Sequence, residues 1–165
     1  LNGWHSAQQK GIPEKAFLEA ANYAGRDNAR TPMQWNSGKH GGFSQGVPWM
    51  KVNENTSRIN VDAQQIGSDS ILNYFRAMTA LRKAYPVLTY GSYQPLEETP
   101  DSLFLYFRES DKEKLLIVLN FSDQVTNLPD LVKPVISQRL IGNYADPGNE
   151  AVVRPWESIV YRCTK

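Results

Sequence analysis

Apolar residues recur at helical spacing between Ser70 and Ala84 and predict a helix there. Arg82 and Lys83 lie near its C-terminal end, where cations favour the helix dipole, and Pro86 ends it. The apolar positions are Ile71, Tyr74, Phe75, Met78, Leu81 and Tyr85. Because such a stripe is typical of packing in a core, we interpret it as a buried face and not as a cofactor site.

A second helix is predicted from Pro13 to Ala24, with Pro13 in the first turn and Gly25 as the stop. Residues 36–68 then carry glycine and proline among polar residues, and this stretch is too long for an ordinary connection in a compact domain. Phe43 and Trp49 in this loop are candidates for platforms that stack on carbohydrate. Large aromatic residues in loops are more often buried in local cores, so both interpretations stay open.

The pattern changes after Pro86 from helical to strand-like. Two apolar runs, Leu103 to Phe107 and Leu115 to Phe121, flank a charged hairpin loop from Arg108 to Lys114. Further strands are expected at Leu88 to Tyr93, Val135 to Ile141, Glu150 to Val153 and Ser158 to Arg162. Short strands separated by turn signals are typical of an antiparallel sandwich, so we expect a second domain from residue 88 onward.

The segment from Arg26 to Trp35, hereafter the arginine segment, combines two guanidiniums, an acid, amides and an indole. Such donors and acceptors beside an apolar ring suit a small polyhydroxylated ligand. Pro32 disfavours helix at Thr31, so we expect an ordered irregular loop, where functional residues often lie. A loop fixed by salt bridges would have the same composition, and chemistry alone leaves both readings open.

The charge balance narrows the class of partner. Lys and Arg number 18 against 17 Asp and Glu, which leaves a net charge of +1 and no broad basic surface for nucleic acid or an anionic membrane. No apolar run approaches the roughly 20 residues that span a bilayer. Cys163 is the single cysteine, and His5 and His40 are the only histidines. We therefore expect no metal site. The sequence also has no phosphate-binding loop, so we expect no cofactor.

A catalytic set of residues is not evident. Paired carboxylates would be the natural choice for sugar chemistry, but most acids fall in hairpin loops or near helix ends, where they read as solvated charge. They include Glu97, Glu98, Glu109, Asp111 and Glu113. Asp27 is the one acid in a promising context, and the arginines that flank it suit an ion-pair partner better than a proton donor.

Several motifs accompany the arginine segment along the chain. They are Gly41-Gly42-Phe43, Val47-Pro48-Trp49, Val52-Asn53, Ile59-Asn60-Val61, Leu81-Arg82-Lys83, Tyr90-Gly91-Ser92-Tyr93, Leu115 to Phe121 and Pro155-Trp156-Glu157-Ser158. Together they resemble the oligo-1,6-glucosidase and α-glucosidase branch of the α-amylase superfamily of glycoside hydrolases. The resemblance covers nearly the whole chain.

This resemblance implies a mixed fold in two parts. Residues 1–87 would be the α-helical and loop remnant of the last part of a (β/α)8 barrel, and residues 88–165 an all-β antiparallel sandwich, the amylase-type C-terminal domain. The family's aspartate nucleophile, glutamate acid/base and second aspartate would all precede Leu1. Retaining hydrolysis needs two carboxyl groups about 5 Å apart. We therefore expect no catalytic residue in this chain, and an inactive chain by itself.

One role is implied for residues of this chain. The resemblance places Arg26 at the non-reducing glucose of the catalytic subsite, where it would donate to sugar hydroxyls. Arg30 is the weaker candidate for sugar contact and would lie at the rim. Asn36 stands where relatives often have an acid, which leaves the assignment of Arg26 intact.

The implied parent protein is an exo-acting retaining α-glucosidase of short α-glucosidic oligosaccharides. Sucrose isomerases, trehalose-forming enzymes and trehalose-phosphate hydrolases share the motif, and so does the catalytically silent glucosidase-like ectodomain of amino-acid transporter heavy chains. A non-catalytic β-sandwich that binds carbohydrate or stabilises the barrel is the alternative from another class. Its platform would use Tyr90, Tyr93, Phe104, Tyr106 and Phe107.

The expected partner is an oligosaccharide bound by the full-length enzyme. Without a barrel to cover it, the helix from Ser70 to Ala84 would expose its apolar stripe, which favours self-association.

Overall fold

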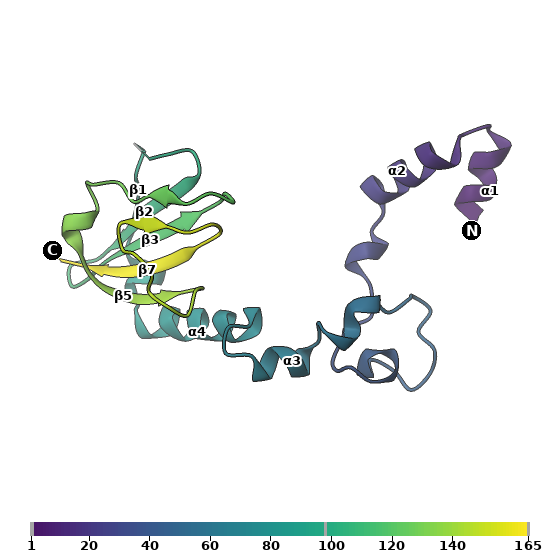
Figure 1. Cartoon of the computed structure of the whole chain (residues 1–165), viewed down its shortest axis with the longest axis horizontal. Coiled ribbons are helices and arrows are strands. Elements are labelled where there is room, and N and C mark those ends of the chain that lie inside the picture. The colour runs from purple at the N-terminus through teal and green to yellow at the C-terminus, as the bar shows by residue number, and fades with distance from the viewer. Residues whose placement is uncertain (1, 98, 165) are drawn as a thin grey trace. The chain divides into compact units, whose positions relative to one another are not determined.

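The computed structural model describes residues 2–97 and 99–164 (Figure 1). The chain divides into two compact units, Leu1–Ala63 and Gln64–Lys165, hereafter the N-terminal unit and the C-terminal unit. Glu98, one of the acids read above as solvated charge, lies outside the described residues. Among the described residues, no helix is both long and apolar enough to cross a membrane.

Short helices joined by irregular backbone make up the N-terminal unit. They are α1 (Asn2–Gln9), α2 (Glu14–Ala24), three 3-10 helices (Asp27–Ala29, Lys39–Gly42 and Glu54–Ser57), and the start of α3 (Val61–Ile66). The predicted helix after Pro13 is confirmed by α2, which Gly25 follows. The rings of Trp4 and Phe17, with centroids 5.2 Å apart, join α1 to α2.

The long loop predicted over residues 36–68 is more helical than its sequence pattern indicates. It holds two of the 3-10 helices as well as α3. Turns this short have no apolar period that could reveal them in the sequence. Gly41 sits at φ 65°, a left-handed conformation that glycine adopts without strain, and its carbonyl accepts hydrogen bonds from the backbone N–H groups of Trp35 (2.7 Å) and Asn36 (3.1 Å).

In the C-terminal unit, α4 (Ile71–Ala84) confirms the helix predicted from apolar spacing. The Ser70 hydroxyl accepts a hydrogen bond from the Asn73 N–H at 3.2 Å and caps the helix N-terminus. The residue after α4 is Tyr85, whose N–H donates to the Leu81 carbonyl.

The strand predicted from Leu88 to Tyr93 is wrong in its first half. Residues Val87–Tyr90 form the short helix α5, and strand β1 occupies Ser92–Pro95. Pro86 has helical φ and ψ, and its carbonyl accepts from the N–H groups of Thr89 and Tyr90 at 2.9 Å. An apolar run of four residues fits a helical turn and a strand equally well, so its pattern could not decide between them.

Together with β1, the remaining described strands build one five-stranded antiparallel sheet and one two-stranded sheet. Their bounds are β2 (Leu103–Glu109), β3 (Lys114–Asn120), β4 (Thr126–Asn127), β5 (Ile136–Gly142), β6 (Val152–Val153) and β7 (Ser158–Cys163), with a 3-10 helix at Lys133–Val135. The larger sheet has the order β1-β2-β3-β7-β5, and β4 pairs with β6. All predicted strands after residue 100 have a counterpart, whereas β4 had no signal in the sequence.

The hairpin between β2 and β3 is tighter than predicted. Arg108 and Lys114, assigned above to the loop, lie in the strands, and Glu109 pairs with Lys114 in the ladder. Their side chains also form an ion pair at 3.0 Å. Opposite charges on paired positions stabilise the end of a hairpin. An alternating apolar pattern does not reveal such charged strand residues.

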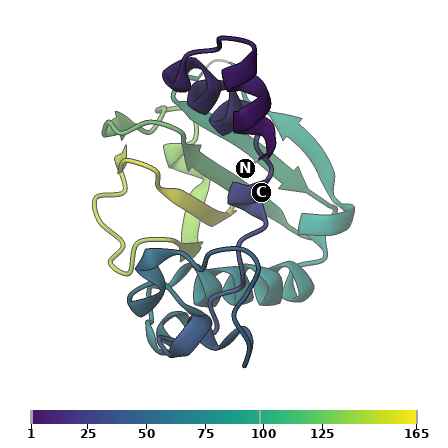
Figure 2. The same cartoon turned by 90° about the vertical axis from the view of Figure 1, so that its right-hand side faces the viewer.

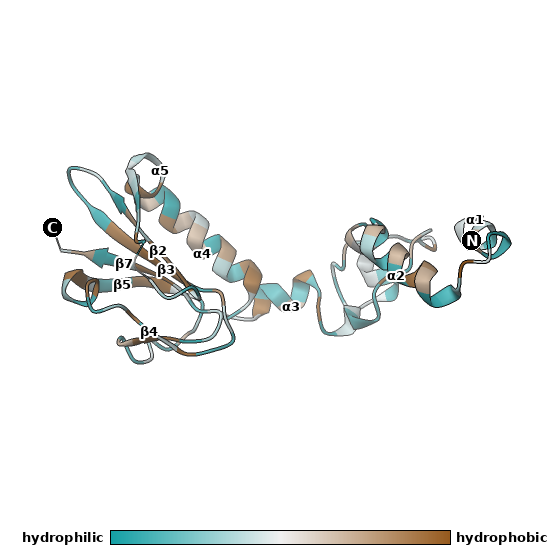
Figure 3. Cartoon of the chain, turned by 90° about the horizontal axis from the view of Figure 1, so that it is seen from above, coloured by the Kyte–Doolittle hydropathy of each residue, from teal (hydrophilic) through white to brown (hydrophobic). Residues whose placement is uncertain are grey.

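Strand β3 is buried on both of its faces. Leu116 and Val118 point into a cluster that β6 and the segment before β5 complete, through Val153, Leu128 and Val132. Leu115 and Ile117 point the other way, into a cluster with Val87, Val160 and residues of α4. In Figure 3, α4 and α5 accordingly lie on one side of the large sheet and β4 on the other.

The face of α4 toward the sheet carries Met78 and Leu81, and Tyr85, the residue after the helix, packs against the same cluster. The Tyr74 hydroxyl lies 2.6 Å from Ser158 Oγ, and Arg162 donates to the Tyr85 hydroxyl at 3.0 Å. Figure 2 shows α4 beside the strands. In this chain α4 and α5 thus pack with the strands. The predicted domain boundary at residue 88 stays a prediction.

A buried ion pair closes the turn before β7. The side chain of Glu157 is 2% exposed, and its two oxygens accept from Arg154 Nη2 at 2.7 Å and Arg154 Nε at 3.2 Å. Arg154 also donates to Asp146 at 2.9 Å and lies 3.9 Å from the centre of the Tyr144 ring. The hydrogen bonds that Arg154 donates to Glu157 raise the pKa of its guanidinium, and those that it donates to Asp146 lower the pKa of that carboxyl.

We expect Glu157→Ala to lower the free energy of unfolding of the C-terminal unit by about 3 kcal/mol, because it leaves the Arg154 guanidinium without its buried partner. Urea denaturation followed by circular dichroism measures the change. Lys133→Ala is the control, since it removes the exposed pair with Asp130 and should change stability far less. Equal effects of the two substitutions would contradict this account of the pair.

Candidate functional site

The arginine segment begins directly after Gly25, which follows α2, and its residues Asp27–Ala29 form a 3-10 helix. A Cβ at Gly25 would lie 2.3 Å from the Ala21 carbonyl oxygen, so the chain can leave the helix this tightly only at glycine. The sequence predicted an irregular loop here; the structure adds one helical turn to it, which the backbone N–H of Arg30 closes by donating to the Asp27 carbonyl at 3.0 Å.

The two arginines of the segment have different surroundings. Arg30 Nη2 donates to Asp27 Oδ1 in an ion pair whose side chains are 57% and 71% exposed. Arg26 is exposed, and no hydrogen bond or ion pair of its side chain is found with the described side chains. Arg26 therefore keeps its donors available, whereas Arg30 is engaged with Asp27.

Gln34 ties the arginine segment to the chain beyond residue 52. Its amide nitrogen donates to the Ile59 carbonyl at 2.5 Å and to Asn55 Oδ1 at 3.1 Å. The Asn53 amide donates in turn to Gln34 Oε1 and to Thr31 Oγ1, both at 3.2 Å. The sequence left open whether the polar side chains of the arginine segment serve a ligand or fix a loop; in the structure the Gln34 amide holds the chain beyond residue 52.

Backbone hydrogen bonds reinforce this link. The N–H of Val61 donates to the Gln34 carbonyl at 2.9 Å, and the N–H of Asp62 donates to the Trp35 carbonyl at 3.0 Å. Residues 31–35 and 53–62 are therefore fixed to each other through both side chains and backbone.

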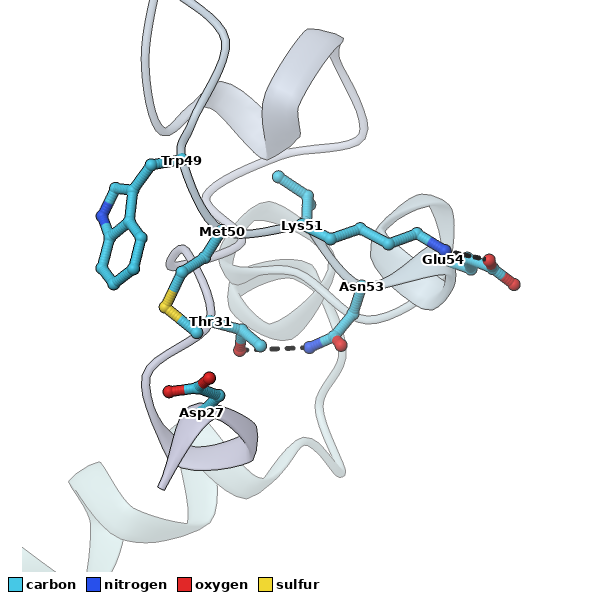
Figure 4. A pocket seen from close by; sticks show the side chains of 8 residues that line it. Asp27, Thr31, Trp49, Met50, Lys51, Asn53 and Glu54 are labelled. Carbon is cyan, nitrogen blue, oxygen red and sulfur yellow. Dashed lines mark hydrogen bonds and ion pairs between the residues drawn. The ribbon is translucent and has the colours of Figure 1, made fainter. Parts of the chain in front are cut away.

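A pocket of about 400 Å³ opens beside the arginine segment (Figure 4). We call it the Asp27–Trp49 pocket. It is lined by Asp27, Thr31, Trp49, Met50, Lys51, Val52, Asn53 and Glu54. Neither Arg26 nor Arg30 lines it, so the structure separates the pocket from the guanidiniums that the sequence singled out. Its lining from residues 49–54 was not predicted beyond Trp49.

The charged groups of the pocket are paired. Lys51 Nζ lies 2.6 Å from Glu54 Oε1, and this hydrogen bond lowers the pKa of Glu54. The described carboxyls whose pKa is displaced are Glu54, Asp130 and Asp146, and for each of them a neighbouring cation lowers the pKa. These acids suit ion pairs better than proton donation. No group of three His, Cys, Asp or Glu residues that could hold a metal is found in the described part of the chain.

The aromatic residues of the proposed platform that lie in strands divide between the two faces of the sheet, whereas Tyr90 ends α5 and is exposed. Tyr106 lies 5.1 Å from Tyr93 and 5.5 Å from Phe104, measured between ring centroids. Together with α4 these three rings line a groove of about 760 Å³ in the C-terminal unit, and burial raises the pKa of Tyr106. Phe107 instead packs against the cluster on the opposite face, as strand alternation requires.

The model of the α-amylase catalytic domain matches residues 1–91. The chain therefore belongs to the α-amylase family, and the resemblance seen in its motifs is confirmed. It is 42% identical to the probable oligo-1,6-glucosidase 2 of Bacillus subtilis over 170 residues, which cover 100% of this chain and 30% of that protein.

Two solved structures are similar over almost the whole chain. The trehalose-6-phosphate hydrolase of Bacillus licheniformis is 34% identical, with a TM-score of 0.84, and is matched over 99% of this chain and 31% of that one. The isomaltulose synthase of Klebsiella sp. LX3 is 31% identical, with a TM-score of 0.81, over 98% and 30%. The chain thus spans about 30% of the length of these relatives.

We expect Asn53→Ala to loosen the link between residues 31–35 and 53–62, because it removes both hydrogen bonds that its amide donates. The cost is about 1 kcal/mol of local stability for such exposed bonds. Amide hydrogen exchange at Val61 and Asp62 should become faster and measures the effect. Lys51→Ala, which breaks only an exposed ion pair, is the matched control; faster exchange in both variants or in neither would show that Asn53 has no such role.

Proposed function

We propose that this chain is the C-terminal portion of a retaining α-glucosidase that acts on short α-glucosidic oligosaccharides. One observation carries the proposal: the chain is 42% identical, over its full length, to a probable oligo-1,6-glucosidase. Identity is lower, at 34% and 31%, to the trehalose-6-phosphate hydrolase and the isomaltulose synthase. Both of these activities stay as alternatives within the same branch.

The proposed fold of the parent protein has two parts. Residues 1–87 belong to the end of a (β/α)8 barrel and residues 88–165 to an antiparallel sandwich. The match of the catalytic-domain model, which ends at residue 91, supports this division. The apolar cluster between the large sheet and the β4–β6 sheet supports the sandwich.

Arg26 is proposed to bind the non-reducing glucose of the substrate in the parent enzyme. Its exposure supports this role, because a guanidinium that no described side chain engages can offer its donors to sugar hydroxyls. Arg30 is the weaker candidate for sugar contact. Its ion pair with Asp27 commits part of its donor capacity, and it orients the carboxylate beside Arg26.

The chain alone is proposed to be inactive. Retaining hydrolysis needs a nucleophile and an acid/base on two carboxyl groups about 5 Å apart. Asp27, the acid of the arginine segment, is paired with Arg30, and the resemblance assigns both catalytic carboxylates to residues that precede this chain. The substrate of the whole protein follows from the relatives' names alone and is part of the proposal.

A second candidate function is a non-catalytic carbohydrate-binding module. The observation in its favour is the ring cluster of Tyr93, Phe104 and Tyr106 in the groove beside α4. The contacts of this groove with Met78 and Ile117 equally suit a stabilising role, in which the rings only cover the sheet. A catalytically silent relative would share every feature described above.

Self-association through α4 is also proposed. The face toward the sheet is covered, but Ile71 and Phe75 are 82% and 69% exposed. Apolar side chains this exposed on one helix favour contact with a second protein surface.

The decisive experiment compares the chain with a chimera in which it replaces the matching 30% of the Bacillus subtilis relative. We expect the chain alone to hydrolyse no 4-nitrophenyl α-glucoside and the chimera to hydrolyse it. Arg26→Ala in the chimera should lower kcat/KM by about 10²–10³-fold, as does the loss of one donor to charge that develops in a transition state. Arg58→Ala, an exposed arginine of the same unit, is the matched control and should leave kcat/KM unchanged.

Two results would contradict the proposal. Robust turnover by the isolated chain would show that it carries catalytic carboxylates of its own. A folded chimera that is inactive, or that loses as much activity with Arg58→Ala as with Arg26→Ala, would remove the role of Arg26.

A further inference from the structure

Trp49 is the uncovered aromatic residue of the Asp27–Trp49 pocket. Its side chain is 87% exposed, although it lies in an ordered loop between Pro48 and the 3-10 helix Glu54–Ser57. The sequence left two readings for this indole, a local core or a platform. Exposure of this degree excludes the local core within this chain, because a core residue would be shielded by its neighbours.

The segment that presents Trp49 is held in place. The Asn53 amide, four residues further along, donates to Thr31 and Gln34, and the Thr56 hydroxyl donates to the Asn36 carbonyl at 3.4 Å. An indole mounted on a segment with such anchors loses little conformational freedom when a ligand stacks on it, which favours binding.

Polar groups face the same space as the indole. In Figure 4 the Trp49 ring and the Met50 thioether lie above the carboxylate of Asp27, and the Thr31 hydroxyl lies beside them. An apolar ring opposite a carboxylate and a hydroxyl matches a pyranose, which offers C–H groups on one face and hydroxyl groups at its rim. The volume of about 400 Å³ is within the roughly 300–1,000 Å³ of small-molecule sites.

The charged residues that line the pocket are two acids and one lysine. Its one lysine, Lys51, extends away from Asp27 in Figure 4 and is bound to Glu54 at 2.6 Å. Asp27 presents a negative charge to the pocket, and its cationic partner Arg30 is not among the residues that line it. A phosphate placed here would meet a carboxylate and find no free cation in the lining.

We propose that the Asp27–Trp49 pocket binds a neutral glucosyl unit, stacked on the Trp49 indole, and rejects phosphorylated sugars. The inference rests on the proposed function in taking an α-glucosidic oligosaccharide as the ligand. It goes further in two ways. It assigns to residues 49–54 a saccharide position separate from Arg26, and it predicts that this position binds neutral sugars and not phosphorylated ones.

The test is a titration of the ¹⁵N-labelled 165-residue chain with isomaltotriose, followed by NMR of the tryptophan indole signals. The chain has four tryptophans, and the signal missing from Trp49→Tyr identifies Trp49. We expect a saturable shift of the Trp49 signal with isomaltotriose and none with glucose 6-phosphate at the same concentrations.

Three variants make the test specific. Trp49→Ala should weaken isomaltotriose binding by about tenfold, the loss of one aromatic contact, whereas Trp49→Tyr keeps a ring and should retain most of the affinity. Phe43→Ala is the matched control, because Phe43 is a 50% exposed aromatic residue of the same loop and does not line the pocket. Backbone amide signals report binding in the variants that lack the indole.

The inference is overturned if isomaltotriose causes no saturable shift, if glucose 6-phosphate binds equally well, or if Phe43→Ala weakens binding as much as Trp49→Ala. Its failure is distinguishable from failure of the proposed function. If the chimera is active but the chain binds no saccharide at Trp49, only the proposed pocket is wrong. If the chain binds saccharide at Trp49 but the chimera is inactive, only the proposed α-glucosidase function is wrong.

Discussion

The amide of Gln34 is the constraint on which the site depends. It accepts from Asn53 and donates to Ile59 and Asn55, so one side chain fixes two stretches of irregular backbone that no sheet or long helix supports. Backbone hydrogen bonds from the N–H groups of Val61 and Asp62 to the carbonyls of Gln34 and Trp35 reinforce this link. The arginine segment is therefore held against residues 53–62, and the pocket that Trp49 lines opens beside it.

We propose that this region serves substrate binding and not bond cleavage. Arg26 offers donors, Asp27 is held by Arg30, and Lys51 is held by Glu54. A retaining glycosidase needs two carboxyl groups, one that exchanges a proton and one that attacks the sugar. None of these pairs resembles that arrangement. The proposal therefore gives these residues the task of orienting a sugar and assigns the reacting groups to residues that precede this chain.

Sequence patterns predicted the elements whose packing follows a regular period. The helix α4 and strands β2 and β3 were predicted because one face, or both, meets an apolar core. The patterns failed at Val87–Tyr90, where a four-residue apolar run forms a helical turn, and at β4, which has two residues. In the site, the two arginines stood out by composition. The role of Gln34 and the lining from Met50 to Glu54 did not, because they depend on contacts between residues about 20 positions apart.

A crystal structure of the chimera with glucose bound tests the central claim most directly, because it shows which atoms of this chain touch the sugar. The account predicts a guanidinium nitrogen of Arg26 within about 3.2 Å of a glucose hydroxyl, the range of a true hydrogen bond. Glucose bound in the catalytic subsite with the Arg26 guanidinium turned to solvent or to protein groups would contradict it.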